Sequence, residues 1–279
     1  MNLITRYFLV LALVLTASVP PEGEIAAAQT PSPSPTRSPA QTETKITAAA
    51  RIEPLRPGFE LPNGQTLHYQ ADWRFMDAGI ATFHLERAGA QEHLAGTADS
   101  TGVVAMLFRV ADRFNSYFDA RSLCTTKLVK HTEEGLRHRD TVITYDYSRG
   151  KAVLEERNLR DNTQKRLEND IPGCVTDVVS GILYVGTLPL QQGATYSFPL
   201  NDGGKTVTVQ AHVEGKEQVK TPAGTFDTIR VGPEGEYGPL KNRGRVWIWY
   251  TDDAHHLPVQ MRAHLFWGTL TVYLTSISK

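Results

Sequence analysis

Apolar and polar residues alternate with a period of two through most of the chain from about residue 60 onward. In residues 67–75 every second residue is apolar, and the same alternation returns in residues 81–85 after the turn signal Asp77-Ala78-Gly79. Successive side chains of a β-strand point to opposite faces of a sheet. The two segments therefore predict an antiparallel hairpin with one face buried.

Further runs with this alternation, or with a β-rich composition, follow at short intervals. They span residues 94–100, 113–119, 125–131, 137–147, 152–158, 163–167, 194–200, 205–219, 225–231, 244–251, 258–266 and 269–276. Several are separated by turn signals, among them NDGG at residues 201–204 and TPAG at residues 221–224. This spacing predicts a meander of strands joined by hairpins.

Two segments follow helical spacing instead. Apolar residues recur at i, i+3, i+4 and i+7 in residues 103–110, and a wider apolar stripe covers residues 175–183. The second segment is the better helix, because Asp177 lies in its first turn, where a carboxylate favours the helix dipole. Many strands with only two short helices predict an α+β fold, mainly β and mainly antiparallel.

The N-terminus has the features of a secretory leader. Arg6 precedes the apolar run FLVLALVL, and the small residues Ala26 to Ala28 precede Gln29. The run is much shorter than the roughly 20 residues that a membrane-spanning helix needs. We expect a signal peptide at residues 1–28, with an uncleaved N-terminal anchor as the alternative. No cysteine lies near the leader, so lipid modification there is not expected, and no later segment predicts a transmembrane span.

A segment rich in proline, serine and threonine follows the leader and includes PSPSPTRSP. Such a composition cannot bury a core, so residues 29–58 are expected to form a disordered linker. The linker is either a tether that holds the domain away from a surface or simply a disordered N-terminus. Residues 59–279 are then one β-rich globular domain, long enough for one sizeable core.

The charges are balanced and mixed along the chain, with 29 Lys and Arg against 30 Asp and Glu. The absence of a dense basic patch predicts no nucleic-acid partner. The only two cysteines are Cys124 and Cys174. In an exported chain an even count favours a disulfide, here closing a loop worth on the order of 4 kcal/mol. Two buried free thiols are the alternative.

No set of residues predicts a reaction. There is no GxSxG motif, and Ser180 lies within the apolar stripe, where a small packing residue is expected. His255 and His256 are adjacent, so on a strand they would point to opposite faces and could not share one metal. We therefore predict no catalytic residue, no metal site and no cofactor. A pair of glycosidase carboxylates stays open, because their spacing in a β protein is not readable from sequence.

Aromatic residues on the strands are the candidates for binding. We take Trp73, Phe75, Trp247, Trp249 and Tyr184 as candidate ligand-binding residues. The strand that contains Trp247 and Trp249 is apolar on both faces. This indicates either a central strand covered by a helix or a strand that lines an apolar cavity.

Several segments, in this order, resemble an exported bacterial family known as domain of unknown function 3108. They are LHYQADWRFMDAGIATFHL (67–85), CVTDVVSGILYVGTLPLQQG (174–193), VKTPAGTFDTIRV (219–231) and VWIWYTDDAHHLPVQMRAHLFWGTLTVYL (246–274). The family's usual arginine after the helix tyrosine is replaced here, since Val185 and Gly186 follow Tyr184. The resemblance implies no reaction. It implies an envelope-associated domain, similar in architecture to lipoprotein-carrier half-barrels, in which a curved antiparallel sheet wraps around one or two short helices.

The leading hypothesis is a non-enzymatic envelope protein that binds an apolar or polymeric envelope ligand or a partner protein. It is expected in the periplasm or outer envelope of a Gram-negative bacterium, with its oligomeric state open. One alternative is an envelope-polymer hydrolase, which needs an open cleft with two carboxylates about 5 to 10 Å apart. The other is a structural scaffold protein, which needs a filled core and an exposed patch in place of a hollow.

Overall fold

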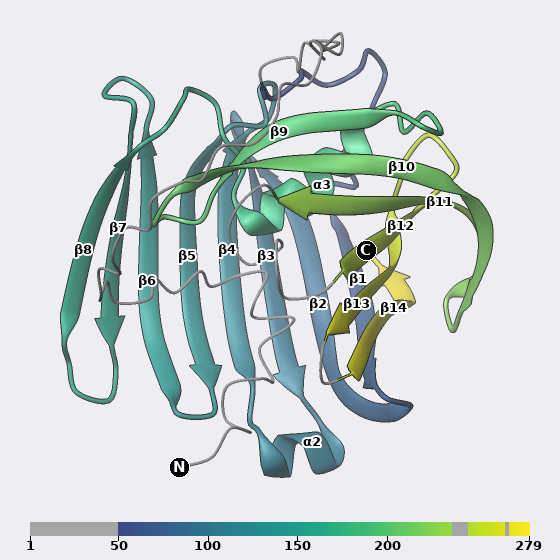
Figure 1. Cartoon of the computed structure of the whole chain (residues 1–279), viewed down its shortest axis with the longest axis horizontal. Coiled ribbons are helices and arrows are strands. Elements are labelled where there is room, and N and C mark those ends of the chain that lie inside the picture. Colours follow the sequence, from purple (N-terminus) through teal and green to yellow (C-terminus); the bar gives the residue numbers. More distant parts are fainter. Residues whose placement is uncertain (1–49, 236–244, 266–267) are drawn as a thin grey trace, which may run out of the picture.

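The predicted strands form one antiparallel sheet of 14 strands in the computed structural model, which describes residues 50–235, 245–265 and 268–279 (Figure 1). The strands are β1 (Gln65–Trp73), β2 (Met76–Ala88), β3 (Gln91–Ser100), β4 (Ala111–Asp119), β5 (Thr125–Glu134), β6 (Arg137–Asp146), β7 (Lys151–Asn158), β8 (Gln164–Asp170), β9 (Thr195–Asn201), β10 (Thr206–Thr221), β11 (Gly224–Gly235), β12 (Arg245–Thr251), β13 (Pro258–Leu265) and β14 (Gly268–Ser278). Two short helices accompany the sheet within the described residues, α2 (Gly102–Leu107) and α3 (Val178–Thr187). The predicted fold class is confirmed. The predicted leader and most of the predicted linker lie outside the described residues.

The strand order shows how the chain builds the open sheet. It runs β8-β7-β6-β5-β4-β3-β2-β1-β14-β13-β12-β11-β10-β9, so every neighbour is consecutive in sequence except β1 and β14. The chain thus makes two meanders that join through the first and last strands. Strands β8 and β9 form the two edges, and the connection between them contains α3. That connection crosses from one edge of the sheet to the other. Figure 1 shows that it does so on the concave side of the curled sheet, where α3 lies.

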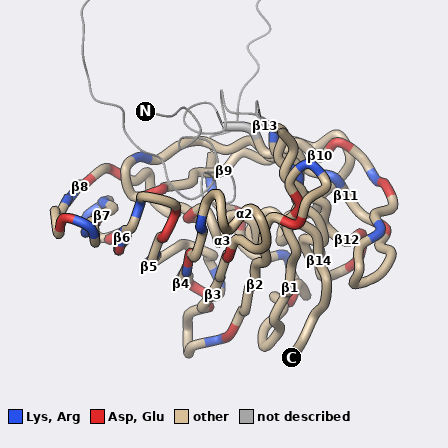
Figure 2. The backbone as a smooth tube through the Cα atoms, turned by 90° about the horizontal axis from the view of Figure 1, so that it is seen from below, with Lys and Arg blue, Asp and Glu red and all other residues tan. Residues whose placement is uncertain are grey.

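The two edges approach each other through the turn between β9 and β10. Asn201 Nδ2 donates to Asn169 Oδ1 at 2.7 Å, and Asn169 Nδ2 donates to the Gly203 carbonyl at 2.9 Å. Gly203 has a φ of +90°, and a Cβ there would lie 2.6 Å from Ile143 of β6. Only glycine fits so close a contact in this conformation. Viewed from the α2 end, the sheet curves like a trough (Figure 2).

The core lies between α3 and the concave face of the sheet. Val179, Tyr184 and Val185 of α3 are buried in the main hydrophobic cluster. A Cβ at Gly186 would lie 2.9 Å from the His256 carbonyl oxygen, so α3 lies directly against the turn between β12 and β13. Buried side chains of α3 therefore pack against the concave face of the sheet.

A buried carboxylate fixes the start of α3. Asp177 is the N-cap, and its Oδ1 accepts hydrogen bonds from the backbone N–H groups of Val179 (2.7 Å) and Ser180 (3.0 Å). Its Oδ2 accepts from the hydroxyls of Ser116 on β4 and Thr125 on β5, at 2.5 and 2.9 Å. Ser180 completes the capping box. Ser180 is buried, as expected of a small packing residue, and its hydroxyl also bonds to the helix cap.

The predicted disulfide is confirmed. Cys124, just before β5, is bonded to Cys174, which lies three residues ahead of the helix cap. The segment between Cys174 and the helix also bonds to both parts of the sheet. Thr125 donates its N–H to the Val175 carbonyl at 2.9 Å, and Thr176 forms an isolated parallel bridge to Leu200 on β9. The helix is thus pinned to the meander as expected.

The packed chain begins at about Arg51, ahead of the boundary at residue 59 expected from composition. The Glu53 N–H donates to the Tyr184 hydroxyl at 2.9 Å. The Arg56 Nε donates to the Thr187 carbonyl, at the end of α3, at 2.8 Å. The proline-rich composition indicated a linker here. Composition could not predict these hydrogen bonds, because their partners lie on a helix more than 100 residues away in the sequence.

Two local predictions were wrong in detail. The first hairpin turns at Arg74 and Phe75, whose φ angles are +50° and +74°, and not at Asp77-Ala78-Gly79. A register shift beside Ala71 keeps that triplet inside β2. The helical segment at 103–110 is shortened to α2, and its predicted stripe is turned outward. Val104 is buried, whereas Met106 and Leu107 are exposed.

Candidate functional site

The two tryptophans of β12 lie on the face of the sheet opposite to α3. Tyr250 donates its hydroxyl to the Ile182 carbonyl of α3 at 2.8 Å, so it points into the core, and the alternation places Trp247 and Trp249 on the outer face. Trp247 Nε1 donates to Glu214 at 3.1 Å, and Trp249 Nε1 donates to Glu217 at 2.9 Å. Their polar groups are thus used within the sheet.

The other three aromatic candidates lie in separate places. Tyr184 is buried on α3, with its ring edge-on to Phe198 at a centroid distance of 4.9 Å. Trp73 ends β1, where the Arg74 guanidinium lies 5.5 Å from its ring centroid. Phe75 is fully exposed on the hairpin turn. The structure therefore does not bring the five predicted ligand-binding residues into one surface.

A hollow of about 310 Å³ lies instead on the concave face of β6, β7 and β8. We call it the mouth groove, because it lies toward the α2 end of the sheet. It is lined by Arg137, Arg139, Leu154, Glu156, Asn158, Thr163, Gln164, Lys165, Leu167 and Gly204. Its volume is at the lower end of the roughly 300–1,000 Å³ typical of ligand pockets.

The described residues that line the mouth groove are mostly polar, with an excess of positive charge. Arg137, Arg139 and Lys165 contribute three cations against the single carboxylate of Glu156. Glu156 accepts from Arg139 Nη1 at 2.5 Å and lies opposite Lys165 on β8. A guanidinium presents several N–H donors in a fixed plane, which suits carboxylate and phosphate groups.

A pair of buried carboxyl groups adjoins the groove. Glu134 of β5 and Asp112 of β4 both point inward, and Arg137 Nη1 lies 3.7 Å from Glu134 Oε2. Neither carboxylate oxygen of Glu134 accepts a hydrogen bond of ordinary geometry from a described residue. Burial and the adjacent Asp112 carboxyl raise the pKa of Glu134 to about 8. Burial likewise raises the pKa of Asp112.

Sequence reasoning missed these residues, although a signal was present. Lys130, Thr132 and Glu134 occupy the same inward face of β5 as Leu128. Arg137 and Arg139 likewise share the inward face of β6 with Ile143. Polar residues at one end of an otherwise apolar face indicate that polar groups, and not the apolar core, surround this end of the strand. The long, polar-rich strands of this meander were apparent, but which of their faces turned inward was not.

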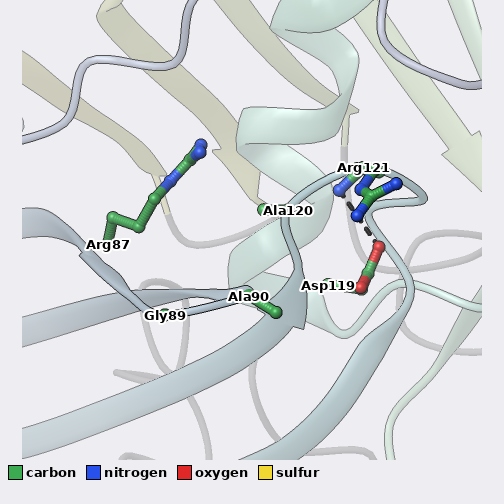
Figure 3. A pocket seen from close by; sticks show the side chains of 6 residues that line it. All are labelled: Arg87, Gly89, Ala90, Asp119, Ala120 and Arg121. Carbon is green, nitrogen blue, oxygen red and sulfur yellow. Dashed lines mark hydrogen bonds between the residues drawn. The ribbon is translucent and has the colours of Figure 1, made fainter.

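A second hollow, of about 470 Å³, lies at the opposite end of the sheet between the β2–β3 turn and the end of β4 (Figure 3). Arg87, Asp119 and Arg121 supply its charged groups. Arg87 is paired with the buried Glu92, and Asp119 Oδ1 accepts from the Arg121 N–H at 3.0 Å. Because Arg87 and Asp119 serve these local contacts, only the Arg121 side chain is left among the described lining residues to contribute charge, and this hollow is the weaker candidate.

One histidine of the adjacent pair, His256 in the β12–β13 turn, has a structural role. His256 Nδ1 lies 2.8 Å from the Gly186 carbonyl oxygen and 3.3 Å from Arg56 Nη2. This contact joins the turn to the end of α3 and to the lead-in segment. Within the described ranges no three His, Cys, Asp or Glu side chains converge in a way that could hold a metal ion.

The sequence matches the protein family of unknown function DUF3108 over residues 68–275. This chain belongs to that family. The match covers nearly the whole sheet, from β1 to β14, including both helices and the mouth groove. The chain matches none of the curated proteins.

One solved structure shares the fold at low sequence identity, and two others are similar with lower scores. The crystal structure of a β-barrel-like protein of domain of unknown function DUF1849 from Brucella abortus has a TM-score of 0.51 and 10% identity, covering 82% of this chain and 99% of that one. A protein described as exported, with a YmcC-like fold, from Bacteroides fragilis has a TM-score of 0.36 and 10% identity, covering 79% and 99%. A protein described as a lipoprotein, from Parabacteroides distasonis, has the same score and identity and covers 79% and 97%.

The DUF3108 chain thus has a barrel-like open sheet, and the first of these likenesses supports the fold alone. Across the described part of the chain, neither helix has the length and apolar character that crossing a bilayer requires.

Proposed function

We propose that this DUF3108 protein is an exported, non-enzymatic envelope protein that binds the anionic groups of a polar envelope polymer in the mouth groove. The observation that carries the proposal is the excess of cations in the groove, three against one, on the concave face of the sheet. Concave sites with a few convergent polar groups are the usual places for ligands.

The packing of α3 against the sheet favours a polymeric ligand over an apolar one. Tyr184, Val185 and Val179 occupy the region where an apolar cavity was considered. The mouth groove is lined by arginine, lysine, asparagine and threonine, which suit a hydrated ligand with carboxylate or phosphate groups.

Binding is favoured over hydrolysis by the state of the carboxylates. Among the described residues that line the groove, Glu156 is the one carboxylate, and Arg139 holds it in an ion pair. Glu134 and Asp112 are adjacent and buried, whereas a glycosidase needs two carboxylates separated by about 5 to 10 Å across an open cleft.

Export is supported by the leader-like N-terminus and by the disulfide, since disulfides persist mainly in oxidising compartments. We place the protein in the periplasm or at the outer envelope of a Gram-negative bacterium. Cell fractionation with the native leader tests this location, and a protein retained in the cytoplasm with reduced cysteines would contradict it.

Titration calorimetry with the mature protein tests the binding site. The probes are lipopolysaccharide core oligosaccharide, which carries phosphates, and muropeptides, which carry carboxylates. A dextran oligosaccharide, which carries no ionisable group, is the neutral reference. We expect one anionic probe to bind in a salt-sensitive manner, and Lys165→Gln and the double change Arg137→Gln with Arg139→Gln to weaken it at least about tenfold.

Arg166→Gln is the matched control. Arg166 is exposed on the same strand as Lys165 but is ion-paired to Glu155 outside the groove. Binding by this variant should equal that of the wild type. The proposal is wrong if neither anionic probe binds, or if Lys165→Gln and Arg166→Gln bind equally well. Lys165 is exposed, so its replacement should not disturb folding.

A further inference from the structure

Large apolar side chains are exposed together at one end of the molecule. Of the eight that the described residues expose, six lie on the β1–β2 turn, on α2 and on the β5–β6 turn. We call these six the rim: Phe75, Met76, Val103, Met106, Leu107 and Leu136. Phe75 is fully exposed, Met106 is 86% exposed and Leu107 is 72% exposed. Single exposed apolar residues are common, but a cluster of this kind indicates an interaction surface.

Backbone contacts join the three elements of the rim. The Thr101 N–H, at the start of α2, donates to the Ala78 carbonyl of β2 at 3.0 Å. At the other end of the helix, the Gly135 N–H donates to the Arg109 carbonyl at 2.8 Å. Figure 1 shows α2 and these turns at the same end of the sheet. The rim is thus one continuous feature.

The rim is not explained by the stability of the fold. Arg74 and Phe75 have φ angles of +50° and +74° in a two-residue hairpin turn, where Asn and Gly are the favoured residues. A bulky residue with positive φ is a steric outlier, and the exposed ring of Phe75 gains no packing in return. In α2 only Val104 is buried, so Val103, Met106 and Leu107 do not serve the core either.

Arginines flank the apolar tips. Arg74 precedes Phe75 in the turn, and Arg160 Nη1 donates to the carbonyl of Leu136 at 3.1 Å. Arg109 follows α2 and is 74% exposed, with Glu133 3.6 Å away as its acidic neighbour. Apolar side chains surrounded by arginines are typical of surfaces that bind the interface of an anionic bilayer.

We propose that the rim docks on the surface of a bilayer that contains anionic phospholipids. The apolar tips come from three separate loops and project at one end, which suits a fluid lipid surface, and the flanking arginines complement its negative charge. The proposal is independent of the ligand in the mouth groove. Because Arg137 follows Leu136 in sequence, docking also places the groove next to the membrane.

Vesicle flotation with the mature protein tests the proposal. The vesicles contain phosphatidylethanolamine with phosphatidylglycerol, and neutral phosphatidylcholine vesicles serve as the reference. We expect the wild type to float with the anionic vesicles, less so at high salt. Phe75→Gly and Met106→Gln should each reduce partitioning on the order of tenfold or more, since each removes one large apolar side chain.

Phe75→Gly separates docking from folding, because glycine tolerates the positive φ at this position and should raise stability while docking is lost. Ile277→Gln is the matched control, since Ile277 is an exposed apolar residue outside the rim and should float as the wild type does. The proposal is overturned if the wild type does not float, or if Phe75→Gly floats unchanged. It is also overturned if the wild type forms an oligomer that Phe75→Gly dissociates while neither floats. Oligosaccharide binding by Phe75→Gly should stay unchanged. The experiment can therefore refute membrane docking by the rim without refuting ligand binding in the mouth groove.

Discussion

The carboxylate of Asp177 allows a direct test of how α3 is held on the sheet. Asp177 is fully buried, and its two oxygens have separate tasks. Oδ1 caps the helix through the N–H groups of Val179 and Ser180. Oδ2 accepts from three hydroxyls, those of Ser116, Thr125 and Ser180. Asp177→Ala removes both tasks, whereas Asp177→Asn keeps the capping oxygen and replaces the other with an NH₂ group.

The expected loss for Asp177→Ala follows from these contacts. Loss of an N-cap costs about 1 kcal/mol. In this variant the hydroxyls of Thr125 and Ser180 can still hydrogen-bond to each other, since they lie 3.0 Å apart. The buried hydroxyl of Ser116 loses its acceptor, which costs about 1–3 kcal/mol. We therefore expect the free energy of unfolding to fall by about 2–4 kcal/mol. Asp177→Asn should lose only about 1 kcal/mol, because asparagine caps as well as aspartate and hydroxyl groups can turn to accept from its NH₂.

Urea denaturation with the disulfide intact, followed by tryptophan fluorescence, measures both values. Asp170→Ala is the control, since Asp170 is exposed and its ion pair with Lys151 should contribute no more than about 1 kcal/mol. The reasoning is refuted if Asp177→Ala is no less stable than Asp170→Ala. It is also refuted if Asp177→Asn loses as much as Asp177→Ala.

Two further predictions concern the cross-link and the buried acids. Replacing Cys124 and Cys174 together with serine should lower the free energy of unfolding by about 4 kcal/mol, since the disulfide spans 50 residues. Reduced wild type should match this variant in urea denaturation, and equal stability of the oxidised and reduced forms would contradict the prediction. The pKa of Glu134 is raised from 4.5 to about 8 in the folded protein. Between these two pH values Glu134 therefore holds a proton in the folded state that it loses in the unfolded state. Stability should therefore fall as the pH rises from about 5 to about 8, by at most about 1.4 kcal/mol per pH unit. Glu134→Gln should flatten this slope in thermal melts, and an unchanged slope would rule out Glu134 as its source.

The strands were predictable because their signals are local. Alternation reports which side chains share a face, and turns such as residues 201–204 and 221–224 connect strands that are neighbours in sequence. The first hairpin shows the limit of this reasoning. Its turn at Arg74 and Phe75 has no composition signal, and the more turn-like Asp77-Ala78-Gly79 is absorbed into β2 by a register shift.

The candidate site was much less predictable. Aromatic content pointed to Trp247 and Trp249, but their indole groups are bonded to glutamates on the outer face. The mouth groove depends on inward-facing charges such as Arg139 and Lys165, which lie on different strands, and on Gly204 from the far edge of the sheet. No pattern within one strand reports that these residues meet.

The sequence by itself determined the alternating strands, the apolar stripe that α3 buries, and the pairing of the only two cysteines, because each depends on neighbours along the chain or on simple counting. The tertiary structure alone decided that β1 pairs with β14 and that the turn after β9 closes on Asn169. It also decided that the apolar stripe of α2 faces outward. The physical reason is that hydrophobic burial has no direction of its own. An apolar stripe has to be covered to contribute to stability, but what covers it, or whether it is left exposed, depends on chain segments far away in the sequence.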